Sequence, residues 1–258
     1  MATTQINAVG QYQACAYRVW ELGDDCAIKK AGGATGAANA IVGTGIVRAN
    51  MSVELKEGAE VEATTACGAL AWYAKDIDRI KRWNMELEVA TWDYELLGIT
   101  VGGTLITAET TGGIGDNPAA WDGKTIGWAA PGPTATTQKA VALEIWARSA
   151  YSTGACSSIA DAPNYVRHVF PRCQLQLSDR AFEEATPGYM KFTGRCDANP
   201  KLVEDLANAG VDDTPWSGPA NPEAISGLTN STYFQMFDNN LPTADPAFDG
   251  GYTVYTFV

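Results

Sequence analysis

The sequence predicts a mainly β protein, an antiparallel β-sandwich or barrel with one or two short helices and long loops. Apolar and polar residues alternate with a period of two in several segments, which is the pattern of half-buried strands. Helix start and stop signals are few. The 26 Gly and 12 Pro among 258 residues indicate many turns, without reaching the composition of a disordered chain.

The alternation is clearest in three segments. In Asn50–Lys56 and Arg82–Thr91, large apolar residues occupy every second position and polar residues fill the others. In Val141–Trp146 the aliphatic positions alternate with Ala, Glu and Trp. Aromatic and β-branched residues, which strands prefer, favour further strands. These further candidates are Tyr165–Phe170, Cys173–Leu177, Tyr189–Cys196 and Tyr252–Phe257.

Two short helices are predicted from their caps. Asp93 can accept hydrogen bonds at the start of a helix that runs through Leu97, and Gly98 can end it. Asn199 and the following proline are typical of a second helix start, with Lys201–Ala209 as its body.

The chain is expected to form a single domain over residues 1–258. Two long irregular segments interrupt it, the Gly- and Ala-rich segment Gly23–Gly45 and the loop Gly102–Gln138. Loops of this length are uncommon in compact domains unless they have a function. The second loop is therefore a candidate interaction element.

Charge and targeting signals exclude some classes of protein. The formal net charge of −12 is the wrong sign for a protein that grips DNA through its phosphates. The N-terminus has no basic region followed by an apolar run, so no secretory signal is expected. No apolar stretch reaches the length of about 18 residues that a membrane span needs, so no span is expected.

The six cysteines are expected to be free thiols, mostly buried. They include no Cys-x-x-Cys pair, and a chain of this length can build a core without disulfides. They are Cys15, Cys26, Cys67, Cys156, Cys173 and Cys196.

No motif predicts catalysis, a cofactor or a metal. The Gly-rich run before Gly45 lacks the Gly-Lys-Ser/Thr of a phosphate-binding loop. His168 is the only histidine and lies in a strand-like run, and no Gly-x-Ser-x-Gly occurs. Asp238 and its neighbours lack EF-hand spacing and suit turns equally well. We therefore expect a protein that is not an enzyme.

Two other classes stay open at this point. Eight Trp in an acidic, β-rich chain suit sugar stacking, which makes a carbohydrate-binding β-sandwich module the principal alternative. Core packing explains Trp residues equally well. A hydrolase on a β scaffold is a third possibility, although sequence cannot show the cleft that paired carboxylates would need.

Three stretches together resemble the major tail proteins of siphophages, particularly phages of actinobacteria. Their order and spacing carry the resemblance, which covers about residues 45–220. They are Asp78–Glu88 running into Asp93–Gly98, then Ala140–Trp146, then Tyr165–Arg172 followed by Phe192–Pro200. The segment Gly23–Gly45 has no counterpart in that family. Many relatives also carry a C-terminal immunoglobulin-like domain, which we do not expect here.

The resemblance implies a tail-tube fold and an assembly. Six subunits of this family form a ring, each giving four strands to an inner β-barrel. The rings stack around a tape-measure protein, meet tail-tip and terminator proteins, and later pass DNA to the host. The expected location is the virion tail, after assembly in the bacterial cytoplasm.

Two groups of residues are candidates for roles in such a tube. Glu54, Glu86 and Glu88, on polar strand faces, are candidates for an acidic lumen wall that repels DNA. The family places a long loop that reaches the next ring where Gly102–Gln138 lies. Trp121, Ile126 and Trp128 are candidates for its apolar anchors. The alternative for this loop is a small surface hairpin that pairs Thr104–Thr107 with Thr125–Trp128.

Overall fold

The computed structural model of the chain describes residues 10–29, 40–64, 67, 70–90, 93–108, 123–133, 139–150, 165–183, 186–201 and 231–238. In these residues strands dominate, and every strand pair is antiparallel, so the predicted fold class is confirmed. The strands are β1 Gly10–Glu21, β2 Ala40–Gly43, β3 Ile46–Lys56, β4 Glu60–Thr64, β5 Leu70–Lys75, β6 Arg79–Val89, β7 Thr104–Thr107, β8 Thr125–Ala129, β9 Val141–Ala150, β10 Tyr165–Glu183, β11 Thr186–Asp197 and β12 Phe234–Asp238. Helix α1 spans Tyr94–Thr100, and Pro200 and Lys201, at the start of the predicted second helix, are also helical.

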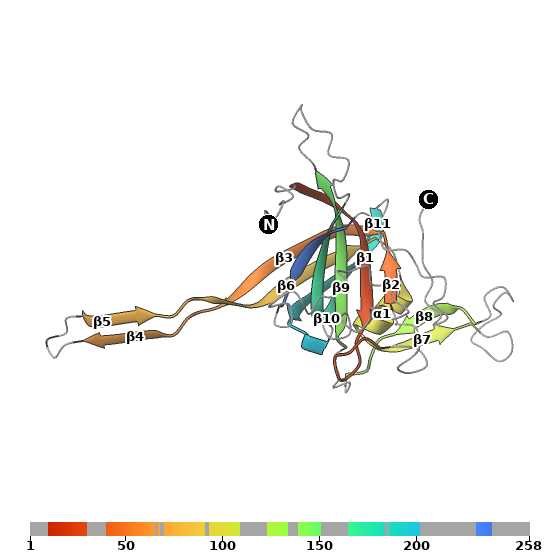
Figure 1. Cartoon of the computed structure of the whole chain (residues 1–258). Coiled ribbons are helices and arrows are strands. Elements are labelled where there is room, and N and C mark those ends of the chain that lie inside the picture. The colour runs from red at the N-terminus through yellow and green to blue at the C-terminus, as the bar shows by residue number, and fades with distance from the viewer. Residues whose placement is uncertain are drawn as a thin grey trace, which may run out of the picture.

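One large sheet forms the body of the molecule (Figure 1). Its strand order is β2-β1-β9-β10-β11-β6-β3, and β12 pairs with β10 beside this path. The sheet curves around its own core, because β1 and β3 contact each other although four strands separate them in the order. A curved antiparallel sheet of this kind closes over its apolar face without needing a second domain.

The main core lies on the concave face of this sheet. β6 supplies Met85, Leu87 and Val89 to it, and the polar residues between them face outward, as the alternation predicts. β9 supplies Val141, Leu143 and Ile145. The remaining fully buried members are Tyr17, Val19, Ile41, Leu96, Leu97, Ile99, Phe170, Cys173, Leu175, Met190, Phe192 and Cys196.

Helix α1 closes one end of the core, and the prediction for it is partly right. Asp93 caps it and accepts hydrogen bonds from the backbone N–H groups of Glu95 (2.9 Å) and Leu96 (3.1 Å). Gly98 does not end the helix, which continues to Thr100. A Cβ atom at Gly98 would lie 3.1 Å from the Leu105 side chain, so this glycine allows β7 to pack closely.

Strand β10 bends where Pro171 interrupts its pairing with β9. The register shifts between Phe170 and Cys173, and from Arg172 onward β10 pairs with β11. Proline has no N–H to donate to a ladder, so it is tolerated at such a bulge. Two predicted strands, Tyr165–Phe170 and Cys173–Leu177, are therefore one bent strand. The predicted strand Tyr252–Phe257 and residues 202–209 of the predicted second helix lie outside the described residues.

Candidate functional site

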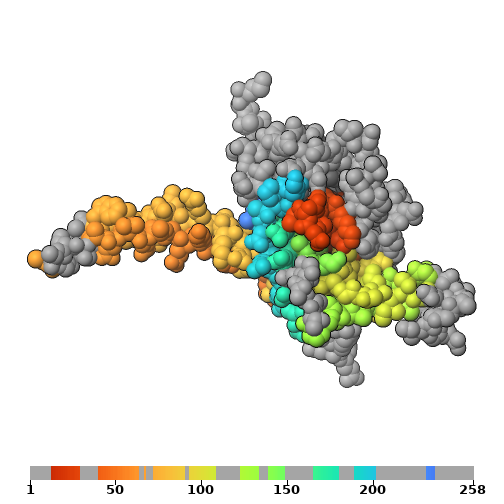
Figure 2. Space-filling view, turned by 90° about the horizontal axis from the view of Figure 1, so that it is seen from below, coloured from red at the N-terminus to blue at the C-terminus, as the bar shows by residue number. Residues whose placement is uncertain are grey.

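A two-stranded arm projects from the body (Figures 1 and 2). The outer ends of β3 and β6 begin it, and the ribbon of β4 and β5 completes it. We define the arm as the described residues between Val53 and Arg82. At the junction of the two parts, a Cβ atom on Gly58 would lie 1.9 Å from the Asp76 carbonyl oxygen. Only glycine fits there without a backbone shift.

The ribbon of β4 and β5 has one apolar face. Residues directly opposite in an antiparallel pair share a face. The pairs Val61–Ala74 and Ala63–Trp72 make that face apolar. The pairs Glu60–Lys75 and Glu62–Tyr73 occupy the other face, which carries the charges. We call the first of these the apolar arm face.

The arm also holds nearly all of the exposed hydrophobic surface in the described part of the chain. Every large hydrophobic side chain that is exposed there lies between Val47 and Ile80, and all except Val47 belong to the arm. Trp72 is 54% exposed and Ile77 is 84% exposed. The others are Val53, Leu55, Val61, Tyr73 and Ile80. Contiguous exposed apolar surface on a soluble protein marks an interaction site.

The prediction for the outer half of β3 is wrong in one respect. Met51, Val53 and Leu55 do share a face, but Val53 and Leu55 are exposed, because β3 runs past the body there. Sequence reasoning also missed the apolar arm face. The signal was present as a short alternation in Val61–Ala63 and again in Trp72–Ala74.

The outward face of β3, β6, β11 and β10 is polar, and we call it the polar sheet face. Glu54, Glu86 and Glu88 all lie on it, since the register pairs Glu54 with Arg82, Asn50 with Glu86, and Arg48 with Glu88. Each carboxylate has a cationic partner. Lys81 Nζ is 2.6 Å from Glu54, and Lys191 Nζ is 2.7 Å from Glu86 and 3.7 Å from Glu88.

These ion pairs shift the acid–base equilibria of the face in the expected direction. The hydrogen bond from Lys81 lowers the pKa of Glu54, and the hydrogen bond from Lys191 lowers the pKa of Glu86. The bond to Glu86 in turn raises the pKa of Lys191. The Glu54 and Glu86 carboxylates are therefore ionised at physiological pH, and each is paired with a lysine.

The candidate lumen residues lie among cations as well as carboxylates. The cations along the register include Arg48, Lys56, Arg79, Lys81, Arg82, Arg172, Lys191 and Arg195; the carboxylates include Glu54, Glu86, Glu88, Asp179 and Asp197. Whether this face lines a lumen stays a prediction.

The predicted loop anchors have a local structural role where they are described. Ile126 and Trp128 lie on β8, which pairs with β7 as the small hairpin considered as the alternative. The Trp128 indole N–H donates to the Gly102 carbonyl (2.7 Å), and its ring packs against the main core. The Trp128 side chain is thus engaged within one subunit. Trp121 lies outside the described residues.

A buried ionic cluster lies on the convex face of β1, β9 and β10. Glu144 is fully buried and accepts hydrogen bonds from Arg18, Arg167 and the Trp20 indole, which is 3.0 Å away. Both guanidinium groups also lie over the Trp146 ring. Burial alone would raise the pKa of Glu144, but the two arginines outweigh it and hold that pKa below its ordinary value.

His168 is a buried structural histidine. Its Nδ1 lies 2.7 Å from the Tyr233 hydroxyl, and the two rings stack with centroids 5.9 Å apart. Burial lowers the pKa of His168, so the ring is neutral at physiological pH. His168 lies on β10, as the prediction of a strand histidine expects.

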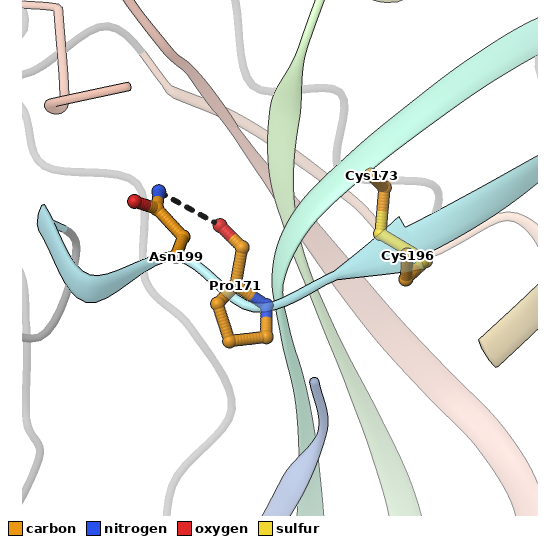
Figure 3. Close-up of a disulfide and its surroundings, with 4 residues drawn as sticks. All are labelled: Pro171, Cys173, Cys196 and Asn199. Atoms are coloured by element: carbon orange, nitrogen blue, oxygen red, sulfur yellow. Dashed lines mark hydrogen bonds between the residues drawn. A yellow bond between two sulfur atoms is a disulfide. The ribbon is translucent and has the colours of Figure 1, made fainter. Parts of the chain in front are cut away.

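Two of the six cysteines form a disulfide, which corrects the expectation of free thiols. Cys173 on β10 and Cys196 on β11 lie directly opposite each other, with Cα atoms 4.1 Å apart (Figure 3). Both are fully buried. Cys15, Cys26 and Cys67 are free, as expected. Cys156 lies outside the described residues.

Comparison with protein-family models and with curated proteins finds no match for this chain. The described residues contain no helix that is long and apolar enough to cross a membrane. The features of the chain that bear on its function are therefore the arm, the polar sheet face and the sequence motifs between residues 45 and 220.

Proposed function

We propose that the chain is a structural subunit that assembles with copies of itself through its arm. The apolar arm face carries this proposal, because an isolated two-stranded ribbon is at best marginally stable in water. Each large aliphatic or aromatic side chain gains roughly 1.5–3 kcal/mol when it is fully buried. Several such side chains on one arm favour a stable contact with a protein surface.

A second copy of the chain is the partner that fits best. Every subunit has one arm, so each arm needs one partner surface. Another copy of the chain supplies such surfaces in the same number as the arms. An arm that packs on a different surface of its neighbour makes a heterologous contact. Such contacts generate closed rings or open filaments.

We infer that this assembly is the tail tube of a long-tailed phage, with stacked six-membered rings through which DNA passes. The motif order between residues 45 and 220 supports this, as does the curved antiparallel sheet with an open edge strand, β3. In this assembly the arm is a contact between subunits, and the loop Gly102–Gln138 stays a candidate for the contact with the next ring. The tape-measure, tail-tip and terminator proteins are the further partners, and the role is structural and not enzymatic.

The carbohydrate-binding alternative has one observation in its favour, which is that Trp72 and Tyr73 are exposed aromatic residues. They lie on opposite faces of the ribbon, because they are consecutive in β5. A sugar-binding platform needs aromatic rings on one surface. The arm therefore suits a protein contact better than a sugar.

Assembly by variants on the two arm faces tests the proposal. Trp72→Ser removes the largest side chain of the apolar arm face. Tyr73→Ser is the matched control, because Tyr73 is about equally exposed (51% against 54%) on the opposite face. We expect the wild-type protein to form rings or tubes at high concentration in electron microscopy and light scattering. Trp72→Ser should abolish them, and Tyr73→Ser should retain them.

Two results would contradict the proposal. A wild-type protein that stays monomeric at every accessible concentration would exclude self-assembly. Equal loss of assembly in both variants would show that the apolar arm face has no special role.

A further inference from the structure

A cleft beside the end of β1 gathers more cations than carboxylates. It has a volume of about 430 Å³ and is lined by the end of β1, the turn that follows, the residues before β9, and β10. Lys29, Lys139 and Arg172 line it together with Glu21 and Asp24. This is within the size range of small-molecule sites, about 300–1,000 Å³.

One buried carboxylate holds two ammonium groups at this cleft. Glu21 Oε1 is 2.9 Å from Lys29 Nζ and 3.2 Å from Lys139 Nζ, and the Glu21 side chain is only 4% exposed. A single carboxylate can neutralise only one of the two lysines. The lysine ends are half exposed, so both remain available to a ligand.

Arg172 adds a third cation, and one of its donors is unused. Its Nε atom is buried and has no hydrogen-bond partner in the described part of the chain. This atom is closed off from solvent, so Arg172 contributes to the cleft as a cation on its wall and not through this donor. Asp197 lies opposite Arg172 in the β10–β11 register, but Asp197 is not among the residues that line the cleft.

The backbone around Arg172 is firmly held. The neighbouring Pro171 carbonyl accepts from the Asn199 amide (3.3 Å), and the neighbouring Cys173 is in the disulfide (Figure 3). The same Asn199 amide also donates to the Cys26 carbonyl (2.9 Å), which ties the turn after β1 to β10. The walls of the cleft are thus fixed before any ligand arrives, which lowers the entropic cost of binding.

We propose that this cleft binds a small oxyanion, with Arg172, Lys29 and Lys139 as its ligands and Glu21 as the residue that positions the two lysines. The formal charge of the five groups is +1 with Asp24 included, and Asp24 itself is exposed to solvent. The chemistry fits a phosphate or carboxylate group of a small molecule. The inference is independent of the proposed assembly, because all five groups belong to one subunit.

Titration with inorganic phosphate tests this site. Wild-type protein is titrated by isothermal calorimetry at constant ionic strength, with acetate as a second probe and chloride as the background salt. We expect saturable binding of phosphate, acetate or both, with a millimolar or lower Kd. Arg172→Gln should weaken binding by about tenfold or more, since it removes one of the three cations that line the cleft and charge-assisted bonds are the strong ones.

Two further variants keep the result interpretable. Lys139→Gln changes a half-exposed side chain that is not expected to affect folding, and it should also weaken binding. Lys124→Gln removes an exposed lysine on the β8 hairpin, away from the cleft, and should bind as wild type does. Absence of saturable binding to wild type, or equal binding by wild type, Arg172→Gln and Lys139→Gln, would overturn the proposal whatever the state of assembly.

Discussion

At the residue scale, the most demanding feature is the buried pairing of Glu144 with Arg18 and Arg167. Charges removed from water are costly unless they are paired and hydrogen-bonded. Here one carboxylate accepts hydrogen bonds from two guanidinium groups and an indole, and the Trp146 ring covers both cations. The strands β1, β9 and β10 each supply one charged member, so the cluster fixes how these three strands pack.

We predict that Glu144→Gln destabilises the fold strongly. The change leaves two buried arginines without a counter-charge, and breaking a buried pair in this way typically costs about 3–5 kcal/mol. Urea unfolding followed by tryptophan fluorescence measures the loss. Glu54→Gln, which removes an exposed and solvent-screened pair, should leave the unfolding midpoint nearly unchanged.

A second prediction concerns His168 and pH. Burial lowers its pKa in the folded state below the ordinary 6.5, so the unfolded chain binds a proton first as the pH falls. The contribution of the neutral ring to stability is complete above about pH 6.5 and is lost as the pH falls below that value. Unfolding midpoints at about pH 7.5 and about pH 5.5 should differ less in His168→Phe than in wild type. The same pH dependence in both proteins would assign the effect to other groups.

At the element scale, a proline and a disulfide lie next to each other at the bend of β10. Pro171 interrupts the pairing with β9, which ends at Cys173, and Cys173 is linked to β11 by the disulfide. The disulfide joins two neighbouring strands of the core where their Cα atoms are 4.1 Å apart. It therefore fixes the β10–β11 register at the place where β10 changes partner.

We predict that the disulfide stabilises the fold by roughly 2–4 kcal/mol, because it closes a loop between residues 23 apart in sequence. The double variant Cys173→Ala and Cys196→Ala should unfold at lower urea concentration than oxidised wild type. Peptide mapping under non-reducing conditions should recover a Cys173–Cys196 linked peptide. Complete alkylation of both residues in unreduced, unfolded protein would show that no disulfide forms.

At the scale of the whole molecule, charge and apolar surface are distributed unevenly. The polar sheet face carries many cations in a chain of −12, and the exposed hydrophobic residues of the described part cluster on the arm. Net charge keeps such subunits apart in solution, whereas the arm favours their contact. The balance between these two effects should make assembly dependent on salt, since salt screens the repulsion.

We predict that the arm can be removed without unfolding the body. Replacement of residues 57–78 by an Asn-Gly turn joins Lys56 to Arg79, which are already paired. None of the described residues in this segment belongs to either hydrophobic core cluster, so the unfolding midpoint should stay close to that of wild type. The variant should be monomeric at concentrations where wild type assembles. A shortened protein that unfolds would show that the arm is part of the folding unit.

The sequence by itself determined the fold class, the direction that each side chain takes in β6, and the cap of α1. These features depend on neighbours in sequence. The period of two fixes the face of a strand on which Leu87 or Glu88 lies, and the Asp93 side chain reaches N–H groups only two and three residues away.

Only the tertiary structure decided whether a face is covered and which distant residues meet. Leu55 and Leu87 both lie in segments where apolar and polar residues alternate. Leu55 is exposed because β3 has left the body at this point, whereas Leu87 is buried because β6 is still within the body there. Cys173 and Cys196 pair because the β10–β11 register places them opposite each other. Glu144 lies on a strand buried on both faces, so its alternation could not reveal its burial. Periodicity specifies orientation, whereas burial and long-range pairing depend on what the rest of the chain places against each face.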